Sequence, residues 1–278
     1  MLVMLAIPTV SIIFMFLSGL ISIIVPIVLA IYLFRKKKQK ISTLLIGAAT
    51  FVVFALILEA TINKLVLSNS SPFGQDILHN IWLYGAYAGL AAGIFEEVGR
   101  FIAFKLILKK ATNPDDSLMY GVGHGGIEAI ILVGLQLTII GVYAVIFNSN
   151  PGSGALSQDI LDTLEPLSSS PAIYSLIAGI ERMIAITLQI ALSVIVFVGV
   201  KNKGKNYLIF IAILIHAFVD FMAVILMEFT NVYLTETVIL ILTLVTVFFA
   251  YRLYKEMKSK MIVLKTVEDK SSPMNIEQ

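Results

Sequence analysis

The sequence contains no cysteine among its 278 residues. Disulfides, iron–sulfur clusters and thiolate zinc sites are therefore excluded, and no cysteine is available as a nucleophile. Charge is scarce as well, since 14% of the residues are Asp, Glu, Lys or Arg while 58% are hydrophobic. A soluble domain averages about 25% charged residues. The composition excludes a water-soluble globule, a disordered chain and a nucleic-acid-binding protein.

The few charges are unevenly placed. Residues 1–34 carry none, whereas residues 35–40 carry five of the 38 and residues 255–278 carry nine. An uncharged start of this length is too apolar for the core of a soluble domain. It is also too long for a cleaved signal peptide, and it lacks the basic residues with which such a peptide begins. The pattern predicts an all-α, polytopic membrane helix bundle.

Seven apolar segments are long enough to cross the hydrocarbon layer, which takes about 20 residues. Polar and turn-forming residues separate them. The predicted spans are 5–34, 41–67, 79–108, 118–147, 172–200, 206–228 and 234–254. They make up a single transmembrane helical domain, residues 1–254, which is followed by a polar cytoplasmic tail, residues 255–278.

Lysine and arginine are segregated among the connecting segments. They occur in loops 35–40, 109–117 and 201–205 and in the tail. They are absent from the N-terminus and from loops 68–78, 148–171 and 229–233. Because loops rich in Lys and Arg stay in the cytoplasm, the alternation predicts an external N-terminus and a cytoplasmic C-terminus.

Ionisable side chains within the spans are the strongest indication of function. Each one costs roughly 2.5–3.5 kcal/mol to insert into the bilayer core, so such residues face the bundle interior and find partners there. The spans contain Glu59, Glu96, Glu97, Arg100, Glu128, Glu181, Arg182 and Asp220. A set this dense indicates a functional site.

The third span carries two adjacent glutamates. Glu96 and Arg100 are four residues apart, so they share a helix face and can pair. Glu97 continues a stripe of glycines at four-residue spacing, which lets a neighbouring helix approach closely. Two interpretations stay open. Arg100 either keeps one carboxylate ionised while the other transfers protons, or the charges form a structural ion pair that locks helices together.

Two of the three histidines lie within spans, each four residues before a carboxylate. His124 precedes Glu128 in the glycine-rich start of the fourth span, and His216 precedes Asp220 in the sixth. A carboxylate at this spacing orients the imidazole or joins it as a metal ligand. At a rise of about 1.5 Å per residue, Glu96 and both histidines lie roughly 10–18 Å from the cytoplasmic helix ends. Three helices therefore contribute to one layer.

This layer has the composition of a catalytic zinc site, in which two histidines and a carboxylate leave a position for water. A free glutamate nearby can accept a proton from that water. The predicted metal ligands are His124, His216, Asp220 and Glu128. The predicted catalytic group is Glu96, Glu97 and Arg100. The pair Glu181–Arg182 either lines the outer part of the same cavity or forms a buried structural ion pair.

Three motifs resemble those of a superfamily of membrane metalloproteases that includes the type II CAAX-prenyl endopeptidases, the PrsW-type proteases and the bacterial immunity-type peptidases. The first is a Glu-Glu pair followed by a basic residue. The second is an aromatic residue four positions before a histidine, and the third is His-x-x-x-Asn or Asp. They match the segments 96–100 (EEVGR), 120–124 (YGVGH) and 216–220 (HAFVD). The GHGGIEA and ER elements resemble the YhfC branch of intramembrane metalloproteases, and the resemblance covers about residues 79–225.

The resemblance implies a bacterial plasma-membrane enzyme that binds zinc through His124 and His216, with Asp220 in place of the family's Asn or Asp. It also implies that Glu96 activates water, while Glu97 and Arg100 organise the site. One spacing departs from the pattern, because the prenyl endopeptidases have EExxxR where this chain has EExxR. One residue is 100° of helix rotation. The superfamily also resembles the scaffold subunit of gamma-secretase, which is not a protease itself.

The favoured hypothesis is a zinc-dependent membrane protease that hydrolyses a peptide bond in the cytoplasmic half of the bundle. Its predicted partners are membrane lipid and a peptide or membrane-protein substrate. A proton- or ion-coupled transporter is the first alternative, since the same side chains can form a proton relay. A non-catalytic scaffold, in which the polar layer only holds helices in register, is the second.

Overall fold

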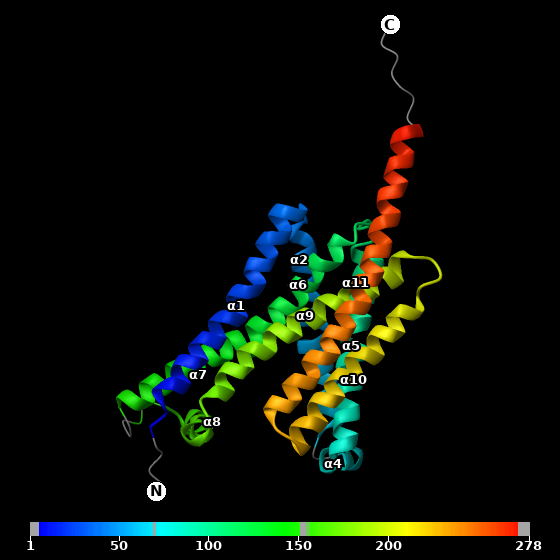
Figure 1. Cartoon of the computed structure of the whole chain (residues 1–278). Helices are drawn as coiled ribbons and strands as arrows, with labels where there is room; N and C mark the ends of the chain where they lie inside the picture. Colours follow the sequence, from blue (N-terminus) through cyan, green and yellow to red (C-terminus); the bar gives the residue numbers. More distant parts are fainter. Residues whose placement is uncertain (1–5, 69–70, 151–153, 155, 272–278) are drawn as a thin grey trace.

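The computed structural model describes residues 6–68, 71–150, 154 and 156–271, and these ranges fold into helices and turns without strands. Long helices run side by side between two ends of a bundle (Figure 1). In chain order they are α1 (Thr9–Lys37), α2 (Ile41–Phe51), η1 (Val52–Glu59), α3 (Ala60–Val66), α4 (Pro72–His79), α5 (Ile81–Ile102), η2 (Ala103–Ile107), α6 (Asp115–Ala129), η3 (Ile130–Leu135), α7 (Gln136–Ser149), α8 (Gln158–Ser169), α9 (Ile173–Lys201), α10 (Tyr207–Phe229) and α11 (Val232–Ser271). The all-α membrane fold predicted from the sequence is confirmed.

Six helical stretches are long and apolar enough to cross a membrane. They are Thr9–Lys37, Ile41–Val66, Asp115–Ser149, Ile173–Lys201, Tyr207–Phe229 and Val232–Val263. The predicted third span corresponds to α5 with η2, which lies against α10 but is not among the six. This segment carries the charges of Glu96, Glu97, Arg100 and Lys105, which lower its hydropathy. The count of seven spans therefore stays a prediction, with α5 as the span in question.

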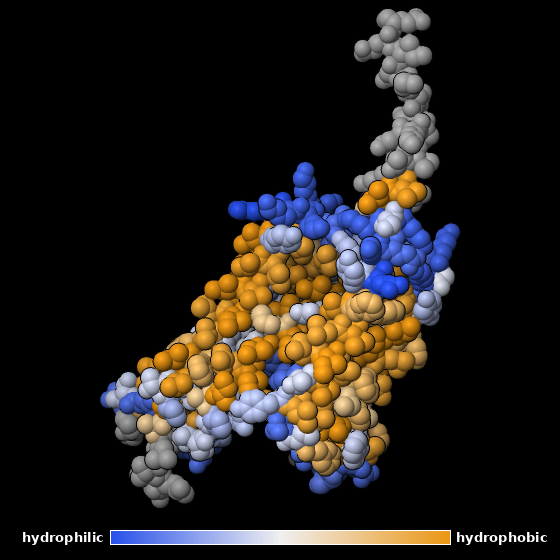
Figure 2. Space-filling model, viewed as in Figure 1, coloured by the Kyte–Doolittle hydropathy of each residue, from blue (hydrophilic) through white to orange (hydrophobic). Residues whose placement is uncertain are grey.

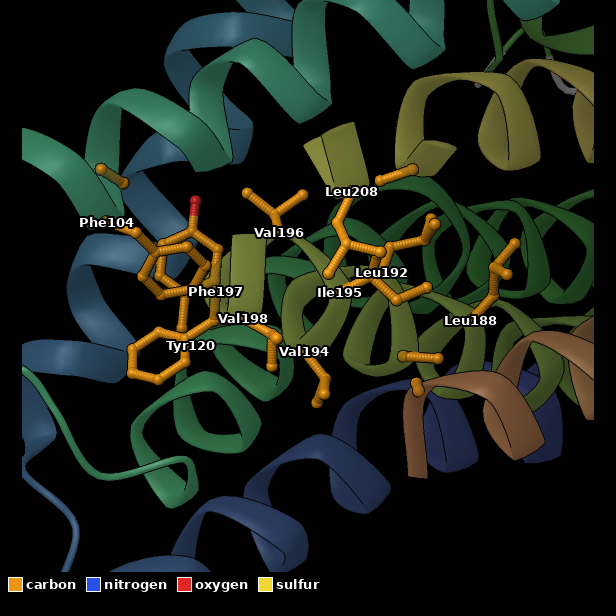
Figure 3. Packing of buried hydrophobic residues seen from close by; sticks show 14 of the residues in the cluster. Phe104, Tyr120, Leu188, Leu192, Val194, Ile195, Val196, Phe197, Val198 and Leu208 are labelled. Carbon is orange, nitrogen blue, oxygen red and sulfur yellow. The ribbon is translucent and has the colours of Figure 1, made fainter. Parts of the chain in front are cut away.

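Helix α9 forms the centre of the bundle. In its most apolar window 72% of the residues are buried, against 17–33% in the other five spans. Leu192, Ile195, Val196 and Phe197 of α9 are fully buried among aromatic side chains from η2 and α6 (Figure 3). Helices α1, α6, α10 and α11 pack against α9, and the polar side chains of Gln189 and Ser193 on α9 are buried among them.

The two ends of the bundle differ in charge. Figure 1 places the α1–α2, η2–α6 and α9–α10 connections at the same end as the C-terminus, and the N-terminus, α4 and α8 at the other. Figure 2 shows the strongest hydrophilic colour at the C-terminal end, above a broad apolar belt. The three Lys-containing loops thus share one end, which is the arrangement that the predicted orientation requires.

Three segments differ in detail from the sequence prediction. The loops 68–78 and 148–171 contain the short helices α4 and α8, and the fully buried Leu164 of α8 packs beneath the ends of α1 and α7. Helix α11 continues to Ser271 instead of giving way to a separate tail at residue 255. Residue 5 of the first predicted span and residues 272–278 of the tail lie outside the described ranges.

Glycines bring the site helices into close contact. A Cβ atom at Gly89 of α5 would overlap the carbonyl oxygen of Ala217 on α10, and one at Gly93 would lie 2.8 Å from the carbonyl oxygen of Ile213. On α6, a Cβ at Gly123 would overlap the backbone of Leu44 in α2. Small residues at such crossings let helix backbones touch. The stripe predicted in the third span therefore packs against α10, the helix that carries His216.

Candidate functional site

Two imidazole–carboxylate pairs lie next to each other where α5, α6 and α10 meet. His124 Nε2 on α6 is 2.8 Å from Glu96 Oε2 on α5. His216 Nδ1 on α10 is 2.7 Å from Glu97 Oε1 on α5. Both histidines and both glutamates are buried. The adjacent glutamates thus point to different helices, as a rotation of 100° per residue requires.

Arg100 joins the two pairs. Its guanidinium donates to Glu97 Oε1, at 3.4 Å to Glu96 Oε2, and at 3.3 Å to Ser193 Oγ on α9. Arg100 is fully buried, so these bonds supply the charge neutralisation that the membrane interior does not. The sequence predicted a pair between Glu96 and Arg100, and the structure shows it, but Glu97 is the closer partner. We call Glu96, Glu97, Arg100, His124 and His216 the inner layer.

Gln189 of α9, which shares a polar stripe with Arg182 and Ser193 in the sequence, is a central residue that is absent from the predicted ligands and catalytic residues. Its Nε2 donates to Glu96 Oε2 at 3.0 Å and to Glu128 Oε2 at 2.7 Å, while its Oε1 accepts from Arg100. The orientation of the amide is fixed, because a guanidinium only donates and a carboxylate only accepts. Its four-residue spacing from the hydroxyl of Ser193 is the signal in the sequence that marks this polar stripe of α9.

Glu128 and Arg182 belong to a second group, nearer the end of the bundle that carries the N-terminus, α4 and α8 (Figure 1). Arg182 donates to Glu128 Oε1 at 3.0 Å and also pairs with Glu181. Glu236 of α11 lies within electrostatic range of Glu181 and Arg182. We call Glu128, Glu181, Arg182 and Glu236 the outer cluster. The structure shows that Glu181 and Arg182 pair, with Glu181 37% exposed, and that Arg182 connects to the inner layer through Glu128 and Gln189; whether the pair lines a cavity stays a prediction.

Asp220 and Glu59 border the inner layer. Asp220 Oδ2 is 3.6 Å from His216 Nε2, and its side chain is 37% exposed. Glu59 ends the π-helical segment η1, lies within electrostatic range of Glu96, His216 and Asp220, and accepts from Asn63 Nδ2 at 3.2 Å. π-Helical turns are frequent at functional sites. The partial exposure of Asp220 gives water a route to one edge of an otherwise sealed layer.

Aromatic rings fix the orientation of the His124 imidazole. The Phe51 ring meets it edge-on at 5.3 Å between centroids, and the Tyr120 ring stacks on it at 6.0 Å. Tyr120 is the aromatic residue of the motif identified in the sequence. Two buried atoms of the layer, His124 Nδ1 and Glu97 Oε2, have no hydrogen-bond partner among the described residues.

The donor chemistry of the inner layer suits zinc. Two imidazoles, with carboxylates from α5 and α10 beside them, are the ligand types that zinc takes, and the two unpartnered buried atoms are free donor positions. Within the described ranges, no three of these side chains converge as a ready metal cage. The imidazoles and carboxylates bond to one another instead. The residues therefore fit a metal in type and proximity, while their present bonds are those of a closed polar network.

Comparison with known proteins agrees with these motifs. The sequence model of the YhfC intramembrane metalloprotease family matches residues 21–244. The chain is 37% identical over 219 residues to a protein of Bacillus subtilis (strain 168) named "Uncharacterized membrane protein YhfC", and the match covers 77% of this chain and 84% of the relative. No solved structure matches the chain.

The apolar helices and the bacterial relative together indicate an integral protein of the plasma membrane. The family match includes every residue of the inner layer and of the outer cluster. The chain belongs to the YhfC intramembrane metalloprotease family.

Proposed function

We propose that the protein is a zinc-dependent intramembrane protease that hydrolyses a peptide bond of a membrane-embedded substrate at the inner layer. The observation that carries the proposal is the pair of contacts His124–Glu96 and His216–Glu97, which unite three helices in one buried layer. The family match supports the same class of reaction.

The metal donors in this proposal are His124, His216 and Asp220. Glu128, the fourth donor suggested by the sequence, has both carboxylate oxygens engaged by Arg182 and Gln189. We therefore assign Glu128 to the connection between the two polar groups. Bound zinc would supply Lewis acidity to a water molecule and to the scissile carbonyl.

Glu96 is the proposed base that takes a proton from water. Arg100 contacts it at 3.4 Å but holds Glu97 more closely, so Glu96 is the less tightly paired of the two with the guanidinium, although its Oε2 also contacts His124 and Gln189. Glu96 is also 6% exposed whereas Glu97 is fully buried, so water reaches Glu96 more easily. Glu97 would position His216 and balance the charge of Arg100. With the EExxR spacing of this chain, the guanidinium lies closer to the second glutamate than to the first.

The test uses the purified full-length protein. Its metal content is measured by elemental analysis, and its activity is measured in proteoliposomes as new N-termini in a set of single-span peptides. We expect about one zinc per chain and cleavage that Glu96→Gln removes. Substrate flux without bound metal would identify a transporter. Unchanged function of Glu96→Gln in a metal-free protein would identify a scaffold, and either outcome would overturn the proposal.

A further inference from the structure

A basic hollow lies at the lysine-rich end of the bundle, away from the inner layer. It has a volume of about 490 Å³ and is lined by Lys105 and Lys109 at the end of α5–η2 and by Lys201 and Lys203 at the α9–α10 turn. Asn202 and Asn206 add side-chain amides, and no carboxylate lines it. Two segments far apart in the sequence thus line one concave site with four lysines and two asparagines.

Some lysines at this end of the bundle are held in ion pairs, whereas those of the hollow form none with the described residues. Lys205 pairs with Glu256 at 2.8 Å, and Lys258 pairs with Asp115 at 2.5 Å. In the part of the chain that the structure describes, no ion pair involves the exposed Lys105, Lys109 or Lys203. Three positive charges around one hollow repel one another, so an anion there would relieve their repulsion.

Lys201 holds together the two segments that line the hollow. Its ammonium donates to the backbone carbonyls of Phe104, Leu108 and Lys109 at 2.9, 2.8 and 3.2 Å. These carbonyls end the helical segment η2, where the backbone has no further helical partners. The bonds tie α9 to the end of η2, so Lys109 and Lys203 are presented from segments that are held together.

The surroundings of the hollow identify a lipid rather than a soluble anion. Leu106 and Ile107 lie between Lys105 and Lys109 in the sequence, Tyr207 and Phe210 follow the lining residue Asn206, and each of the four is more than half exposed. The hydrophilic end of the molecule meets the apolar belt at this level (Figure 2). A phosphate at the lysines would therefore have apolar side chains beside it for acyl chains. Basic pockets between helices on the cytoplasmic side are the sites where anionic lipid headgroups bind.

We propose that this hollow is a binding site for the phosphate headgroup of an anionic phospholipid, held by Lys105, Lys109 and Lys203 with its acyl chains along η2 and the start of α10. The site is independent of the catalytic proposal, since none of its residues contacts the inner layer or the outer cluster. Binding would fix the junction of α5–η2 with the α9–α10 turn.

The test is native mass spectrometry of the delipidated full-length protein titrated with dioleoylphosphatidylglycerol or dioleoylphosphatidylcholine. The hollow variant combines Lys105→Gln, Lys109→Gln and Lys203→Gln. The control combines Lys36→Gln, Lys37→Gln and Lys38→Gln, which removes the same charge at the same end of the bundle. We expect preferential binding of phosphatidylglycerol, weakened about a hundredfold in the hollow variant and less than about twofold in the control.

Three results would overturn the proposal. Equal weakening in both triple variants would mean that only the general surface charge attracts the lipid. Equal binding of both lipids would remove the role of the anionic headgroup. Full displacement of phosphatidylglycerol by excess inorganic phosphate would identify a soluble anion as the ligand. If the triple variant is unfolded by its melting curve, Lys109→Gln and Lys203→Gln are tested singly, with about a fivefold loss expected for each.

Discussion

The inner layer and the outer cluster are built from similar residues but have different surroundings. The side chains of Glu97, Arg100 and His124 are completely buried. In the outer cluster, Glu181 is 37% exposed and Arg182 is 12% exposed. Figure 2 shows hydrophilic residues in a notch at that end of the bundle. Only the inner layer contains histidine, the ligand and proton-transfer group that works near neutral pH.

This difference separates two roles for charge inside a membrane protein. In the sealed inner layer every charge depends on a specific partner, because neither water nor lipid can replace that partner. In the outer cluster, Glu181 is open to water, which reduces the cost of an imperfect pair there. Gln189 connects the two groups, so the comparison can be tested by changing one side at a time and then the link.

The largest effect is expected from removing an imidazole of the inner layer. His124→Ala and His216→Ala should each abolish both metal binding and hydrolysis, because each deletes one of two proposed nitrogen ligands. Metal content and new N-termini are measured on the same preparation. His79→Ala is the matched control, since His79 lies at the exposed end of α4. Metal-binding loss in the His79 variant, or metal retention in both others, would contradict the assignment.

The next largest effect concerns Glu96. Glu96→Gln should lower the rate of hydrolysis by about 10²–10⁴, the usual contribution of a positioned base, while metal content and melting temperature stay close to those of the native protein. If Glu96→Gln stays active and Glu97→Gln is folded, metal-loaded and inactive, then the roles of the two glutamates are reversed.

Glu97 should matter for stability more than for chemistry. Glu97→Gln leaves Arg100 without its closest anionic partner, and breaking a buried pair in this way costs about 3–5 kcal/mol. The partly exposed Glu181 provides the comparison in the outer cluster, and Glu181→Gln should change the free energy of unfolding by about 0–1 kcal/mol. Unfolding in detergent, followed by circular dichroism against denaturant concentration, measures both. Equal costs would remove the distinction between sealed and hydrated charges.

A smaller effect is expected from cutting the link. Gln189→Leu removes the donor shared by Glu96 and Glu128 and the acceptor of Arg100, which should cost about 1–3 kcal/mol of stability. Thr187→Ala, on the exposed face of the same helix, removes only a bond to its own helix at Met183 and should be nearly neutral. A double-mutant cycle of Gln189→Leu with Glu128→Gln should show coupling. Strict additivity would mean that Gln189 does not connect the two groups.

The last prediction concerns the orientation of the chain in the membrane, and its single-cysteine substitutions should leave the fold and stability of the protein unchanged. A cysteine at the exposed Thr163 of α8 should react with a membrane-impermeant maleimide added outside intact cells, and one at Lys203 should react only after lysis. The native chain has no cysteine, so each label reports a single site. The reverse pattern would place the outer cluster, rather than the inner layer, nearer the cytoplasm.

The helical class, the approximate positions of the spans and the residues of the polar layer are predictable from the sequence because they depend on composition and spacing along one helix. The rotation of one helix relative to its neighbour cannot be predicted in this way. The spacing of four between Glu96 and Arg100 predicted their pair, but in the structure Glu97 is the closer partner of Arg100 and also contacts His216 of α10. Gln189 shows the same limit, because an uncharged amide becomes central only when α5, α6 and α9 pack around it.

The close crossing of α5 and α10 has a consequence for protein engineering. Replacing a helical glycine with alanine is a common route to a more heat-resistant protein, since it gains about 0.5–1 kcal/mol where the site has room. At Gly89 there is no room, because the added methyl group would overlap the carbonyl oxygen of Ala217. The substitution would push α10 outward and pull His216 from Glu97. Substituting alanine here on helix propensity alone would therefore disrupt the contact between His216 and Glu97 on which the proposed site depends.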